Sequence, residues 1–105
     1  MIKHANTVKE FDELVAGKTA VVDFFATWCG PCKMLSPVIE QVDAKGLVPC
    51  DFVKVDVDEV EELAMRYGIQ TIPTIIIFKD GKAVSVLRGF MPEQALVAKI
   101  NEALA

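Results

Sequence analysis

Segments with helical and strand patterns of apolar residues alternate along the whole chain. The first helix is predicted to start at a capping box formed by Thr7 and Glu10 and to stop at Gly17. Its core-facing positions are Val8, Phe11, Leu14 and Val15. The apolar run over residues 19–26, interrupted only by Asp23, is typical of a central strand that is buried on both faces.

A turn that carries Cys29 and Cys32 follows this strand. It opens a helix of about 15 residues that ends near Gly46 and that Pro37 is expected to kink. Residues 52–57 then alternate between apolar and polar side chains, which predicts the next strand.

A second capping box, made of Asp58 and Glu61, predicts a short helix. This helix is expected to run through Tyr67 and to stop at Gly68, which supplies the C-terminal signal.

A hairpin and a final helix complete the pattern. The two strands of the hairpin are predicted over residues 74–78 and 83–87, joined by the turn signal Asp80-Gly81. The last helix starts at Pro92, where a missing N–H does no harm. Its core-facing positions are Leu96, Val97, Ile100 and Leu104.

The predicted order of elements is a first strand, to which no residues are assigned, followed by helix, strand, helix, strand, helix, hairpin and helix. This order predicts an α/β fold of three layers, with a central mixed five-stranded sheet flanked by four helices on its two faces. The hairpin adds an antiparallel edge to a parallel centre. With 105 residues, 52% of them hydrophobic and 25% charged, the chain is expected to form one domain over residues 1–105.

The net charge and the hydropathy of the chain limit the classes of partner and the cellular location that we expect. The formal net charge of −4 disfavours binding to nucleic acid or to anionic membrane surfaces. No apolar run approaches the ~18 residues of a membrane span, and the first residues lack the apolar core of a secretory signal. Three cysteines in such a chain do not indicate a disulfide framework, so we expect a reducing, cytoplasmic setting. We also expect the protein to be a monomer.

The segment Trp28-Cys29-Gly30-Pro31-Cys32-Lys33, at a strand-to-helix junction, resembles the active-site motif of the thioredoxin family. The resemblance covers the whole chain. Further residues in register with the family are Asp23, Pro37, Lys54, Ile72-Pro73-Thr74, Asp80-Gly81 and Gly89. The chain departs from the family at Phe25, where many members carry a second Trp, at Arg88, where a small or apolar residue is common, and at Cys50, which lies outside the motif.

The resemblance implies a thioredoxin fold and a dithiol–disulfide oxidoreductase that needs no cofactor beyond its cysteine pair. It also implies a thioredoxin reductase as electron donor and protein disulfides, such as those of reductases and peroxidases, as substrates. A ferredoxin-linked donor remains an alternative. The Gly-Pro pair between the cysteines adds no charge that would stabilise a thiolate, which favours a reductant over an oxidase or isomerase.

The two motif cysteines have different expected roles. Cys29 lies at the start of a helix, where free N–H groups and the helix dipole favour a thiolate, so it is the expected nucleophile. Cys32 lies one turn into the helix and is expected to resolve the mixed disulfide. A zinc site built from Cys29, Cys32, Cys50 and His4 is the alternative, although Cys50 and His4 lack metal-ligand spacing. Another alternative is a redox-inert binding subunit.

Asp23 is a carboxylate inside an apolar strand, so its pKa is expected to be raised. One interpretation is that it accepts the proton of Cys32, and the other is that it forms a structural pair with Lys54. For Lys54, a role in tuning Asp23 and a merely packed side chain with its ammonium in water are both open.

The resemblance also implies that Pro73 follows a cis peptide bond that turns the backbone of Ile72 towards the cysteines. An extended substrate segment could then pair with this backbone. The expected docking surface, flat and weakly polar, consists of Trp28, Gly30, Pro31, Ile72, Pro73 and Gly89. Arg88 lies beside this surface and is expected to stabilise the Cys29 thiolate and to attract acidic partners.

Overall fold

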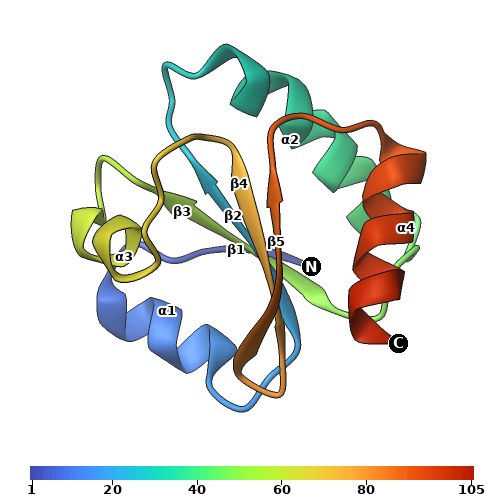
Figure 1. The fold of residues 1–105 in the computed structure, drawn as a ribbon, viewed down its shortest axis with the longest axis horizontal. Coiled ribbons are helices and arrows are strands. Elements are labelled where there is room, and N and C mark those ends of the chain that lie inside the picture. The colour runs from blue at the N-terminus through green and yellow to red at the C-terminus, as the bar shows by residue number, and fades with distance from the viewer.

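The computed structural model describes all residues, 1–105, and has the predicted order of elements (Figure 1). The elements are β1 (Ile2–His4), α1 (Val8–Val15), β2 (Ala20–Phe25), α2 (Gly30–Ala44), β3 (Asp51–Asp56), α3 (Glu61–Arg66), β4 (Thr74–Lys79), β5 (Lys82–Arg88) and α4 (Glu93–Leu104). The strands form one sheet in the order β1-β3-β2-β4-β5. None of the helices combines the length and the apolar character that a membrane crossing needs.

The sheet is mixed, as the pattern predicts. Strands β1, β3 and β2 are parallel, while β4 runs antiparallel to both β2 and β5. Because β2 lies between β3 and β4, its backbone is paired along both edges, and the register places Asp23 beside Lys54 of β3 and Ile75 of β4. The carboxyl end of β2 leads directly into the turn that precedes α2.

Each face of the sheet has its own core. Helices α1 and α3 cover one face, and α2 and α4 cover the other (Figure 1). On the first face, Val22 and Phe24 of β2 pack with Phe11 and Leu63 from the helices. On the second face, the buried residues are Val21, Leu35, Ile39, Val42, Phe52, Ile75, Ile77, Leu96 and Ile100. Since side chains alternate along a strand, Asp23 faces the same side as Val21, towards α2.

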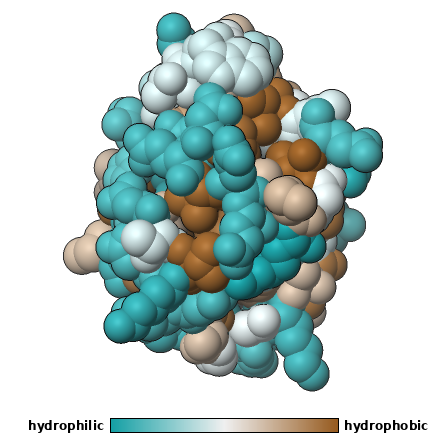
Figure 2. Space-filling view, turned by 90° about the vertical axis from the view of Figure 1, so that its left-hand side faces the viewer, coloured by the Kyte–Doolittle hydropathy of each residue, from teal (hydrophilic) through white to brown (hydrophobic).

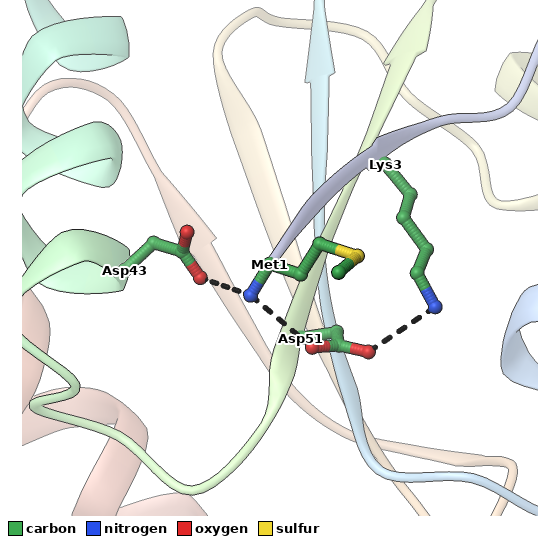
Figure 3. A network of polar contacts seen from close by, with 4 residues as sticks. All are labelled: Met1, Lys3, Asp43 and Asp51. Atoms are coloured by element: carbon green, nitrogen blue, oxygen red, sulfur yellow. Dashed lines mark hydrogen bonds and ion pairs between the residues drawn. The ribbon is translucent and has the colours of Figure 1, made fainter.

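A polar network closes the end of the sheet that lies away from the cysteines (Figure 3). The amino group of Met1 contacts Asp43 near the end of α2 and lies 3.2 Å from Asp51 Oδ1 at the start of β3. Lys3 Nζ lies 3.3 Å from the other oxygen of Asp51. The network therefore joins β1, α2 and β3.

Two predicted helix starts, those of α3 and α4, and one predicted capping contact, in α1, differ from the observed ones. Asp58 does not cap α3: the N-cap is Val60, which offers no side-chain hydrogen bond. In α1, Thr7 caps as predicted, but Glu10 Oε1 accepts from the N–H of Asn6 rather than that of Thr7. Pro92 is the N-cap of α4 and not its first helical residue.

Candidate active site

The Cys-Gly-Pro-Cys segment begins α2. Cys29 is the N-cap, with extended backbone at φ −84° and ψ 116°, and its Sγ accepts a hydrogen bond of 3.2 Å from the N–H of Cys32. Pro31 lies in the first turn, where its missing N–H costs nothing. The sulfur of Cys29 therefore lies at the positive end of the helix dipole, as the sequence predicts, and a thiolate there is stabilised by charge and by hydrogen bonding.

Cys29 and Cys32 form a disulfide, with their Cα atoms 5.2 Å apart. Both residues are only 4% exposed. In the oxidised form, the two cysteines therefore do not differ in exposure. They differ in their positions, because Cys29 is the N-cap of α2 and Cys32 lies within its first turn. Residues Trp28, Gly30 and Pro31 around them are exposed, so a partner can approach the disulfide from this side.

The loop before β4 lies against this disulfide. The Ile72–Pro73 peptide bond is cis, which confirms the expectation from the resemblance. The carbonyl oxygen of Ile72 lies 3.8 Å from Cys29 Sγ, and the Ile72 N–H donates no hydrogen bond within the chain. The N–H of Gly89 donates to the carbonyl of Pro73 at 2.9 Å, which brings the end of β5 to the same place.

Trp28 is 68% exposed, so it is not a core residue. Its Nε1 donates a hydrogen bond of 2.8 Å to Asp58 Oδ2, and this contact holds the indole over the loop after β3. From the sequence, Asp58 was predicted to cap a helix, and its hydrogen bond with Trp28 was not predicted. No local signal points to it, because the two residues are 30 positions apart.

An apolar groove of about 380 Å³ lies between this tryptophan and α3. It is lined by Trp28, Val57, Glu61, Ala64, Met65, Ile69, Gln70 and Ile72. Figure 2 shows the side of the molecule that carries α1 and α3, where apolar patches appear between polar side chains. The groove extends the exposed surface beside Cys29 towards α3, and Met65 at its edge is 81% exposed.

Asp23 is 1% exposed, and neither of its carboxylate oxygens has a hydrogen-bond partner. Burial raises the pKa of Asp23 to about 6, and the nearby charge of Lys54 opposes part of this rise. A carboxyl with this pKa can both hold and release a proton near neutral pH. The expected direction of the shift is confirmed.

Lys54 is the charged neighbour of Asp23. Its Nζ lies 3.7 Å from Asp23 Oδ2, which is within ion-pair reach but too far for a hydrogen bond. The ammonium instead donates to Ser36 Oγ at 3.1 Å and lies 4.7 Å from the centre of the Phe25 ring. The side chain of Lys54 is therefore mostly buried and does not extend into water. Its contacts with Ser36 and Phe25 were not predicted from the sequence.

Cys50 lies at the other end of the molecule. It precedes β3, whereas Cys29 follows the parallel strand β2, so the two cysteines are at opposite ends of these strands. No three His, Cys, Asp or Glu side chains are grouped in a way that could hold a metal ion. Burial, followed by the charge of Asp51, raises the pKa of the Cys50 thiol, which therefore lacks the thiolate character of a nucleophile.

An α/β fold with a mixed sheet and a redox-active cysteine pair at the N-terminus of α2 defines a dithiol–disulfide oxidoreductase. The family model Thioredoxin matches residues 2–102, and the chain belongs to the thioredoxin family. It is 43% identical over 98 residues to a thioredoxin of Staphylococcus aureus, covering 93% of this chain and 94% of that protein.

Solved structures agree with this assignment. A thioredoxin of Malassezia sympodialis superposes with a TM-score of 0.88 at 36% identity, covering 100% of this chain and 92% of the other. A mutant thioredoxin from Halobacterium salinarum superposes with a TM-score of 0.89 at 33% identity, covering 99% of this chain and 91% of the other.

Proposed function

We propose that this disulfide oxidoreductase reduces protein disulfides, with Cys29 as the attacking thiol and Cys32 as the resolving thiol. The observation that carries the assignment is the hydrogen bond from the Cys32 N–H to the sulfur of Cys29 at the helix N-cap. A thiolate at this position gains both a donor and the helix dipole, whereas the sulfur of Cys32 lies one turn into the helix.

The reaction proceeds in two exchanges. The Cys29 thiolate attacks one sulfur of the substrate disulfide, a mixed disulfide forms, and the first substrate thiolate leaves and takes a proton from water. Cys32 then gives its proton to Asp23 and attacks Cys29 Sγ. The second substrate sulfur leaves as a thiolate and is protonated by solvent. The protein is left with the Cys29–Cys32 disulfide that the structure contains.

Substrate docks, in this proposal, on the surface formed by Trp28, Gly30, Pro31, Ile72, Pro73 and Gly89. Two features support it. The unpaired N–H of Ile72 and its carbonyl next to Cys29 offer a short stretch of backbone to an extended substrate segment. The exposed indole of Trp28 offers a flat apolar contact on the other side of the disulfide. Lys54 tunes the proton affinity of Asp23 from the sheet below.

The electron donor that we propose is a thioredoxin reductase in a reducing cytoplasm, and the substrates are disulfides of other proteins. A single copy carries both cysteines and every residue of the docking surface, so the reaction needs no second copy. The uncharged Gly-Pro pair between the cysteines favours the reducing direction.

Reduction of insulin disulfides tests this proposal. With NADPH and a thioredoxin reductase, or with a ferredoxin-linked reductase, one donor is expected to support catalytic turnover. Cys29→Ser and Cys32→Ser are expected to lose this turnover, while Cys50→Ser keeps it. Turnover that survives Cys29→Ser, or that is lost in Cys50→Ser, would contradict the assignment.

A further inference from the structure

A polar crevice opens where β1, α2 and β3 meet. Its volume is about 270 Å³, and it is lined by Ile2, His4, Ser36, Ile39, Glu40 and Lys54. None of these side chains belongs to the docking surface around the cysteines. Lys54 links the crevice to the buried carboxylate of Asp23, because it lines the crevice and its ammonium also lies next to that carboxylate.

The Lys54 ammonium is shared among three neighbours at graded distances. Ser36 Oγ is the nearest, at 3.1 Å, and is its only hydrogen-bond acceptor. Asp23 Oδ2 follows at 3.7 Å, and the centre of the Phe25 ring lies at 4.7 Å. A neutral hydroxyl therefore takes the hydrogen bond that the nearby carboxylate, with both oxygens unpaired, lacks.

We propose that Ser36 is a positioning residue for disulfide reduction: its hydroxyl holds the Lys54 ammonium on the crevice side and keeps it from hydrogen bonding to Asp23. The inference rests on the proposed function of Asp23 as the acceptor of the Cys32 proton. Ser36 touches neither cysteine in this role and acts only through Lys54.

This placement has a chemical consequence. An ammonium at 3.7 Å attracts the carboxylate, but a direct charge-assisted hydrogen bond would stabilise its ionised form further. With the ammonium held at 3.7 Å, the pKa of Asp23 stays higher than a direct hydrogen bond would allow, and the carboxylate is the stronger base. Without the serine hydroxyl, the nearest free acceptor for Lys54 is Asp23, and the carboxylate becomes a weaker base.

Other ionisable groups around Asp23 are few. From β3 the carboxylate faces Lys54, whose ammonium also reaches Ser36 of α2. Near Lys54, Glu40 of α2 and His4 of β1 line the same crevice, and Asp56 follows on the same face of β3. Strand β4 and helix α4 present Ile75, Leu96 and Ile100, which do not titrate. The measurement must therefore report on the Asp23 carboxyl itself.

The test is a ¹³C NMR titration of the Asp23 side-chain carboxyl in the oxidised protein. Ser36→Ala is expected to lower the midpoint by about one pH unit, because Lys54 closes onto Asp23. Ser36→Thr, which keeps a hydroxyl, is the matched control and is expected to keep the parent midpoint. In a Lys54→Met background, Ser36→Ala is expected to change nothing. An unchanged or raised midpoint in Ser36→Ala would overturn the proposal.

A second readout separates this proposal from the function on which it rests. In single-turnover reduction at pH 7, Ser36→Ala is expected to resolve the mixed disulfide about threefold more slowly, with the rate of the first exchange unchanged. Slower resolution without a lowered midpoint would also overturn the proposal, since the effect would not pass through Asp23. A lowered midpoint with normal resolution would support the positioning by Ser36 and contradict the role of Asp23 as proton acceptor.

Discussion

Asp23 is the residue at which stability and chemistry conflict. A buried carboxyl whose pKa is raised from 3.8 to about 6 destabilises the folded state by about 3 kcal/mol once the unfolded chain is fully ionised. Below the unfolded pKa both states hold the proton and the cost is absent. Between about pH 4 and pH 6 only the unfolded state ionises, so stability falls as pH rises, and above pH 6 the loss levels off.

Asp23→Ala is therefore expected to unfold at higher denaturant concentration than the parent at pH 8. At pH 4 the ionisation cost is absent, and the small cavity that the substitution leaves makes the variant equal or slightly worse. The gain at pH 8 is expected to be on the order of 1 to 3 kcal/mol, measured by denaturant unfolding at both pH values. A variant less stable than its parent at pH 8 would show that Lys54 satisfies Asp23 as a structural ion pair.

Cysteine reactivity is the second prediction at the residue scale. In the reduced protein at pH 7, Cys29 is expected to react with iodoacetamide at least about tenfold faster than Cys50, because the helix N-terminus favours its thiolate and burial disfavours that of Cys50. Peptide mass spectrometry of partly alkylated protein measures the order. Initial labelling of Cys32 or Cys50 would contradict the assignment.

At the scale of elements, the turn between β4 and β5 lies against the segment that follows α1, and the N–H of Gly81 donates to the carbonyl of Lys18 at 2.8 Å. Gly81 has a φ of +81°, and a Cβ added there would lie 2.7 Å from the backbone nitrogen of Gly17. Gly46, at the end of α2, has a φ of +63° and open space around it. The two glycines share the unfavourable backbone angle and differ in the clash.

Gly81→Ala is expected to lower the free energy of unfolding by about 2 to 4 kcal/mol, and Gly46→Ala by about 1 kcal/mol. The larger loss arises because the end of α1 and the hairpin must move apart. Chemical denaturation of both variants gives the comparison. Equal losses would mean that the clash relaxes without cost and that only the backbone angle matters.

Elements with strong local signals were predictable from the sequence. The apolar run of β2 and the capped, amphipathic α1 appear where the pattern places them, as does the hairpin at Asp80-Gly81. The predicted start of α3 was wrong because Asp58 makes a tertiary contact instead of a helix cap. Its side chain accepts a hydrogen bond from the indole of Trp28, and α3 has no side-chain cap. The residues of β1 were not placed, because a strand of three residues shows no periodicity.

At the candidate active site, too, the motif residues were predictable from the sequence and a contact between distant segments was not. Both cysteines, Asp23, Lys54 and Pro73 were visible as motif residues, and their positions in the chain indicated the chemistry. The hydrogen bond between Ser36 and Lys54 was not visible, because it depends on how α2 lies across β3, 18 residues further along the chain. Such contacts between elements leave no pattern in a single sequence.

At the scale of the whole molecule, charge bears on the choice of partner. The net charge of −4 opposes association with acidic partners. Arg88 is an exposed cation at the end of β5, next to Gly89 and opposite Thr74. Its position favours a local attraction for acidic groups beside the disulfide, in a field that is otherwise repulsive.

Arg88→Val is expected to slow association with an acidic partner by about two- to fivefold at low ionic strength and to reduce the salt dependence of that rate. The pKa of the Cys29 thiol is expected to rise in the same variant, as measured by the pH dependence of alkylation. Lys82→Val, at the far end of the same strand, is the matched control and is expected to change neither property. If Arg88→Val behaves like Lys82→Val, Arg88 is only a solvated surface residue.

The most direct test of the whole account is a trapping experiment with Cys32→Ser. Without its resolving thiol, the reduced variant is expected to stop at a stable mixed disulfide with a disulfide-containing substrate such as insulin. Peptide mapping by mass spectrometry locates the bond. The account predicts that the substrate is attached to Cys29; attachment to Cys50, or no trapped complex at all, would contradict it.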